Sequence, residues 1–114
     1  MATLAKQSIV PTGLTPVYTA IAGGGDKCVP ADGSFLHFKN TNAATFTVVI
    51  DDPTSVSPPG ALQFNPDLSV IIPATTGDKM IGPITARYAA VADGLAAITY
   101  TGTTTNGTVA SLQT

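Results

Sequence analysis

The stretch ATFTVVID, residues 44–51, decides the fold of this 114-residue chain. Its large apolar side chains, Phe46, Val48 and Ile50, fall on one face of an extended chain. The other face carries Thr45, Thr47, Val49 and Asp51. Alternation with a period of two is typical of a β-strand that buries one face against a core. Residues 96–101 and residues 68–72 repeat the pattern, so we expect three strands of the same kind.

Turn-forming residues recur between these stretches at short intervals. Examples are Asp32-Gly33, Asp93-Gly94 and Asn106-Gly107. Short β-branched runs separated by such turns are typical of an all-β domain. We therefore predict a single antiparallel β-sandwich or jelly-roll-like domain over residues 1–114, with about seven to eight short strands. Residues 84–92 could form one short helix, because several alanines follow Pro83.

Three segments fit this pattern less well. In residues 34–39, Leu36 and Phe38 share a face, so Phe35 should be exposed or lie under a neighbouring element. Residues 51–67 contain four prolines, which excludes a central strand and predicts a stiff exposed loop. Residues 1–15 could be a contact arm.

The composition disfavours several classes of function. Only 11% of the residues are charged, the net charge is −2, and the five basic residues are spread along the chain. Nucleic-acid binding draws its affinity from clustered lysine and arginine, so we expect none. No apolar run is long enough to span a bilayer, and we expect no membrane association. Because 44% of the residues are hydrophobic, we expect a partner to cover part of the surface.

The few reactive side chains do not form a pattern that suggests catalysis. His37 has no second metal ligand at a suitable spacing, and Cys28 lies in no nucleophile motif. Asp51 and Asp52 are adjacent, so on an extended chain they point to opposite faces and cannot act as an acid–base pair. We predict no catalytic residues, no metal site and no cofactor, and the chain should not be an enzyme.

The order of several motifs resembles that of a known group of proteins. These motifs are Ile9-Val10, Thr12-Gly13-Leu14, Pro16-Val17-Tyr18, Gly25-Asp26, Phe35-Leu36-His37-Phe38-Lys39-Asn40, Gly77-Asp78-Lys79-Met80-Ile81-Gly82-Pro83, Tyr88, Asp93-Gly94 and Ile98-Thr99-Tyr100. Between about Ile9 and Leu112 the chain resembles small virion structural proteins of tailed bacteriophages, especially those of actinobacteria. The long loop between Asp51 and Asp67 looks like an insertion relative to shorter members of this group.

This resemblance implies a capsid decoration, or cement, protein. The implied partner is the major capsid protein, whose outer lattice surface such a protein binds and stabilises. The resemblance further implies self-association, with a trimer as the expected form, synthesis in the host bacterial cytoplasm and a final location on the capsid exterior. An alternative is a phage tail component or a receptor- or glycan-binding β-module. A small hydrolase ranks last, because the sequence gives His37 no evident partner.

We expect two regions to contact partners: the N-terminal segment and the proline-rich loop. The predicted contact residues are Thr3, Leu4, Ile9, Val10, Pro58, Pro59, Leu62 and Phe64.

Overall fold

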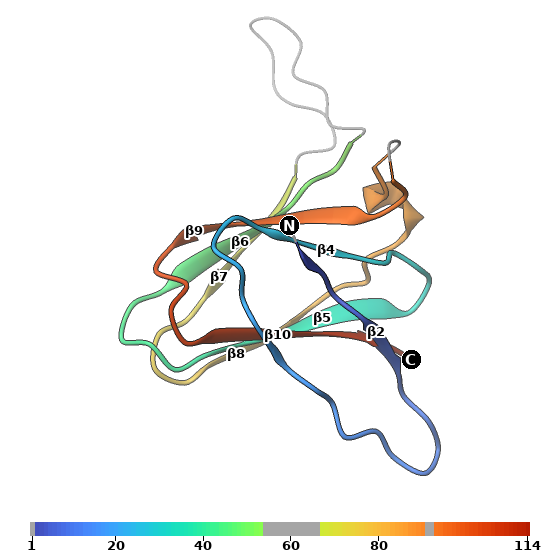
Figure 1. Ribbon diagram of the computed structural model, residues 1–114, viewed down its shortest axis with the longest axis horizontal. Helices are drawn as coiled ribbons and strands as arrows, with labels where there is room; N and C mark the ends of the chain where they lie inside the picture. Colours follow the sequence, from blue (N-terminus) through green and yellow to red (C-terminus); the bar gives the residue numbers. More distant parts are fainter. Residues whose placement is uncertain (1, 54–66, 91–92) are drawn as a thin grey trace, which may run out of the picture.

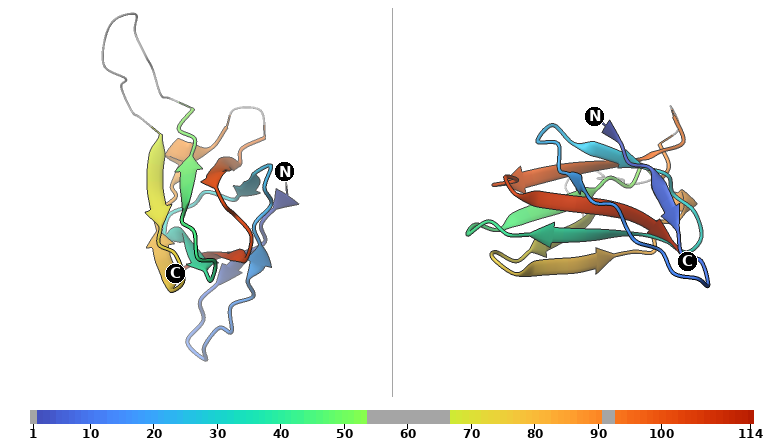
Figure 2. Two further views of the ribbon diagram at one scale, coloured as in Figure 1. Left: turned by 90° about the vertical axis from the view of Figure 1, so that its left-hand side faces the viewer. Right: turned by 60° about the horizontal axis from the view of Figure 1, so that its bottom comes forward.

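The computed structural model describes residues 2–53, 67–90 and 93–114, which form two β-sheets packed face to face (Figures 1 and 2). The strands of the described residues are β1 (Ala2–Thr3), β2 (Lys6–Ser8), β3 (Thr19–Ala20), β4 (Asp26–Cys28), β5 (Ser34–Asn40), β6 (Phe46–Ile50), β7 (Leu68–Ile72), β8 (Gly77–Ile81), β9 (Ala96–Gly102) and β10 (Gly107–Gln113). The predicted β-sandwich is confirmed. The described residues form ten strands instead of about seven to eight. Four of them, β1 to β4, contain only two or three residues each.

The two sheets differ in how their strands are ordered. The first sheet runs β1-β4-β9-β6-β7, with β6 antiparallel to both β9 and β7. The second sheet runs β2-β10-β5-β8, and β3 also pairs with β10. In this second sheet β5 lies between β10 and β8, so that His37 is opposite Ala110 on one side and Met80 on the other.

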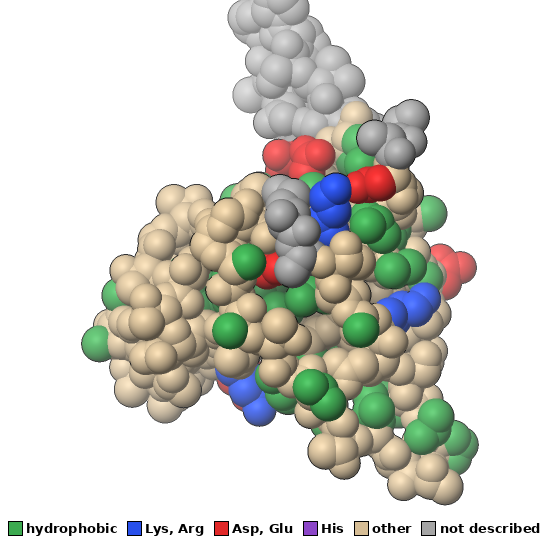
Figure 3. Space-filling model, in the orientation of Figure 1, with side chains coloured by type: hydrophobic (Ala, Val, Ile, Leu, Met, Phe, Trp, Pro, Cys, Tyr) green, Lys and Arg blue, Asp and Glu red, His purple; other side chains and the backbone are tan. Residues whose placement is uncertain are grey.

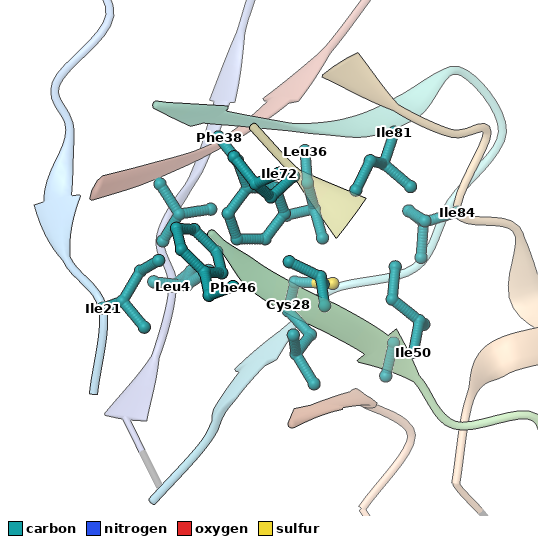
Figure 4. Close-up of a cluster of buried hydrophobic side chains, with 14 residues drawn as sticks. Leu4, Ile21, Cys28, Leu36, Phe38, Phe46, Ile50, Ile72, Ile81 and Ile84 are labelled. Carbon is teal, nitrogen blue, oxygen red and sulfur yellow. The ribbon is translucent and has the colours of Figure 1, made fainter. Parts of the chain in front are cut away.

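The core lies between the inward faces of the two sheets (Figure 4). Leu36 and Phe38 from β5 meet Phe46 and Ile50 from β6, as the alternation predicts. The rings of Phe38, Phe46 and Tyr100 pack edge to face, with centroids 6.2–6.3 Å apart. Edge-to-face pairs of this kind add about 0.5–1.5 kcal/mol each beyond the burial of their area.

Two predictions about local structure need correction. The possible helix at residues 84–92 is, within the described residues, one turn of 3₁₀ helix, η1 (Ala86–Tyr88). The chain before it packs against the sandwich: Ile84 is fully buried, and its backbone N–H donates to the Ser34 carbonyl at 2.7 Å.

No helix among the described residues is long and apolar enough to cross a membrane.

The predicted N-terminal arm is also only partly correct. Residues 2–8 belong to the sandwich, because β1 pairs with β4 and β2 pairs with β10. Leu4 fills a core position between them and is 5% exposed. A side chain buried in this way anchors the segment through the hydrophobic effect. Only residues 9–18 leave the sheets, and they connect β2 to β3.

Candidate functional site on the outer face of the second sheet

The outer face of the second sheet carries apolar side chains and is only partly covered. Phe35 and His37 point away from the core, because they alternate with the buried Leu36 and Phe38. The β2–β3 connection, residues 9–18, lies against this face and leaves an open pocket of about 290 Å³. The prediction that Phe35 would be exposed or lie under a neighbouring element is therefore confirmed.

The pocket is lined mainly by apolar groups. Some come from the β2–β3 connection, and the others come from β5, β8 and β10 of the second sheet. The lining residues are Ile9, Leu14, Pro16, Tyr18, Phe35, His37, Met80 and Leu112.

Two of the exposed large hydrophobic side chains of the described residues, Ile9 and Met80, line this pocket and are 48% and 67% exposed. Leu14 also lines it and is partly buried. We call Ile9, Leu14 and Met80 the apolar face. Figure 3 shows hydrophobic side chains gathered on the projecting segment between β2 and β3. Exposed apolar side chains around a pocket are typical of a site that binds a partner.

The β2–β3 connection is held in a defined position by polar contacts. The Gln7 side chain donates to the Val17 carbonyl and accepts from the Val17 N–H, both at 2.8 Å. The Ile9 N–H donates to the Gln113 carbonyl at 2.8 Å. A turn closes where the Gly13 N–H donates to the Val10 carbonyl, and Gly13 has φ +96°, which glycine adopts without strain. The apolar face is therefore presented on an ordered backbone.

His37 joins this connection to the sheet through two hydrogen bonds. Its Nδ1 lies 2.6 Å from the Tyr18 hydroxyl, and its Nε2 contacts Asp78 Oδ1 on β8. The hydrogen bond from His37 lowers the pKa of Asp78. An ionised carboxylate can only accept, so Nε2–H donates and Nδ1 of a neutral imidazole accepts from Tyr18. Lys39 Nζ lies 4.4 Å from the centroid of the Tyr18 ring and adds a cation–π contact.

His37 therefore has two partners that the sequence did not make evident. Its partners lie 19 and 41 residues away in the sequence. One of them follows from sheet register: His37 pairs with Met80, so Asp78 is its diagonal neighbour on the same face. The side chains of Tyr18, His37 and Asp78 satisfy one another's hydrogen-bonding groups, and the two bonds fix the orientation of the imidazole ring. Within residues 2–53, 67–90 and 93–114, no group of three histidine, cysteine or acidic residues could hold a metal ion.

The remaining polar groups support the fold elsewhere. Asp52 is buried, and Arg87 Nε donates to its Oδ2 at 2.6 Å. Its neighbour Asp51 is exposed overall, but partial desolvation of its carboxyl group and, next, the nearby Asp67 carboxylate raise the pKa of Asp51. The two adjacent carboxyl groups thus lie in different environments. Burial also raises the pKa of the Cys28 thiol to about 11, which does not suit a nucleophile.

The predicted contact residues divide into three groups. Ile9 belongs to the apolar face, Val10 next to it is exposed, and Thr3 is exposed on β1. Leu4 is buried in the core, so its side chain does not form part of a contact surface. Pro58, Pro59, Leu62 and Phe64 lie outside the described residues.

Sequence reasoning missed Leu14 and Met80 as members of this surface. Ile9 and Met80 are 71 positions apart in the chain, and only the pairing of β8 with β5 brings Met80 to the same face. The alternation in β8 could have indicated an outward Met80, because Ile81 next to it is buried. Comparisons with protein-family models, with curated proteins and with solved structures found no match.

Proposed function

We propose that this protein decorates a phage capsid and binds the outer surface of the major capsid protein through the apolar face. The observation that carries the proposal is the exposure of Ile9 and Met80 around the apolar pocket on the outer side of the second sheet. A monomer gains nothing from leaving these side chains in water, whereas a partner that covers them gains the free energy of their burial.

The low charge of the chain supports the same proposal. With 11% charged residues, the protein has little long-range repulsion to oppose close packing against neighbours on a shell. The sequence resemblance to small virion proteins points in the same direction. The function needs a rigid body and a docking surface and uses no catalytic group, and the fixed β2–β3 connection meets this requirement.

The copy number in the particle is the first test of this proposal. Purified virions of the phage whose genome carries this sequence should contain the chain in hundreds of copies, measured by quantitative mass spectrometry. A few copies per particle, or labelling confined to the tail, would refute capsid decoration and favour the tail or receptor-binding alternative.

A second test asks whether the apolar face is the docking surface. The double variant Ile9→Asp/Met80→Asp should fail to bind capsids that lack the protein, because it places two charges where burial is required. The matched control is Thr99→Asp/Thr101→Asp, which adds the same charge to exposed positions on β9 in the other sheet. Equal binding by both variants would refute this choice of surface.

A further inference from the structure

The two sheets end in edge strands that differ in how they are protected against pairing. At one side of the sandwich the edges are β7 in the first sheet and β8 in the second. An edge strand presents unpaired backbone N–H and C=O groups, and proteins usually block such edges with charge, proline or short length. β8 carries the exposed side chains of Asp78 and Lys79. On the other side, β1 and β3 have two residues each, and β2 contains Lys6.

β7 has none of these protecting features. It is five residues long, Leu68–Ile72, and contains no charged residue and no proline. Among the described residues, no strand pairs with the side of β7 that faces away from β6. Ile71 is 61% exposed, and the inward-facing Leu68 and Val70 are only partly buried. The described part of the chain therefore covers neither the backbone nor the side chains of this edge completely.

We propose that β7 pairs antiparallel with β7 of a second copy of this chain, related by a two-fold axis at Val70. In this register Leu68 is opposite Ile72 of the other copy, and Ser69 is opposite Ile71. Every inward-facing residue then meets an apolar residue, and the two partly buried side chains gain cover. An isologous contact of this kind joins two five-stranded sheets into one continuous sheet.

Charge selects the antiparallel arrangement. Asp67 immediately precedes β7, and two antiparallel strands centred on Val70 hold the two Asp67 carboxylates about 20 Å apart along the strand direction. A parallel, in-register pair would place these carboxylates side by side at about 4.8 Å, where like charges repel. Open-ended stacking through this edge is excluded too, because an isologous contact uses the edge of each copy once. The expected species is a dimer, which differs from the trimer that the sequence resemblance implies.

The test is a measurement of molar mass in solution over a series of protein concentrations, by sedimentation or light scattering. The wild-type chain should approach about 23 kDa, twice the 11.5 kDa of one chain. The double variant Ser69→Lys/Ile71→Lys should weaken dimerisation by at least about tenfold, because lysines then face each other across both pairs. Both positions are exposed, so circular dichroism and thermal unfolding should show an intact fold.

A complementary pair of variants tests the register. Ser69→Asp/Ile71→Asp should also be monomeric alone, and an equimolar mixture of the two double variants should form a heterodimer through opposite charges. The matched control, Thr99→Lys/Thr101→Lys, adds the same charge to exposed positions of β9, an interior strand of the same sheet, and should leave the dimer unchanged. A wild-type monomer at all concentrations, a trimer, or a dimer that persists in the double-lysine variant would each overturn the proposal.

Discussion

Replacing Tyr100 by phenylalanine removes one hydroxyl group from the edge of the core and keeps the ring. The Tyr100 hydroxyl donates to Asp26 Oδ2 at 2.7 Å, and Asp26 is 1% exposed on β4. Among the described residues, the Ala22 N–H also donates to this oxygen, at the longer distance of 3.3 Å. A buried carboxylate that loses a donor keeps its desolvation cost, so the variant should lose about 1.5–3 kcal/mol of unfolding free energy.

The assay is urea unfolding followed by circular dichroism, supported by a thermal melt. For a domain of this size a loss of about 2 kcal/mol lowers Tm by roughly 8 °C. Tyr88→Phe is the matched control, because Tyr88 is also partly buried and keeps its ring contact with Arg87 in the variant. A Tyr100→Phe variant as stable as Tyr88→Phe would refute the claim that Asp26 depends on this hydroxyl.

The pH dependence gives an independent check on the same bond. Burial, and then the bond to Asp26, raises the pKa of Tyr100 above its usual 10.0. A group whose pKa is higher in the folded state stabilises the fold fully below its unfolded pKa and less above it. The stability difference between wild type and Tyr100→Phe should therefore stay constant up to about pH 10 and shrink at higher pH.

Three further substitutions and one chemical reaction have expected outcomes. Ser111→Ala should stabilise the protein by up to about 1 kcal/mol in urea unfolding, because the Ser111 hydroxyl is buried and finds no hydrogen-bond partner among the described residues. Ser34→Ala, which removes a hydroxyl that donates to a backbone carbonyl at 3.3 Å, should destabilise it instead. Asp78→Ala should lower the urea midpoint at neutral pH but not well below pH 3.8, because His37 holds the pKa of Asp78 below 3.8, and the stabilisation is lost as pH falls through that lowered value. Cys28, whose pKa is raised to about 11, should not react with a thiol reagent at pH 8 until the protein is unfolded, since roughly 0.1% of the thiol is ionised there.

The long strands could be predicted from the sequence because each carries its own alternation. Residues 46–50 and 68–72 bury the side chains that a period of two assigns to the inner face, with Leu68 and Val70 only partly covered at the edge. The short strands could not be predicted in this way. β1 and β3 have two residues each, too few for any period, and they form because neighbouring strands offer backbone partners.

The candidate site was harder to predict, because its members come from distant parts of the chain. Ile9 was found from local sequence, but Met80 joins it only through the register of β8 against β5. The partners of His37 were missed for the same reason. A single sequence gives the face of a side chain within its strand, whereas the neighbour across the sheet depends on strand order and register.

The apolar face and the β7 edge lie in different sheets, so both proposed contacts can form at once. A two-fold axis that pairs antiparallel edge strands is perpendicular to the sheet, so the second sheets of both copies lie on the same side of the joined first sheet. Both apolar faces of a dimer would then point toward one surface, as attachment to a shell requires. Two linked contacts raise the strength of attachment by about 10²-fold or more over one. Ser69→Lys/Ile71→Lys should therefore bind capsids more weakly than wild type while its apolar face is unchanged. Binding of a monomeric variant at wild-type strength would show that pairing through β7 plays no part in attachment.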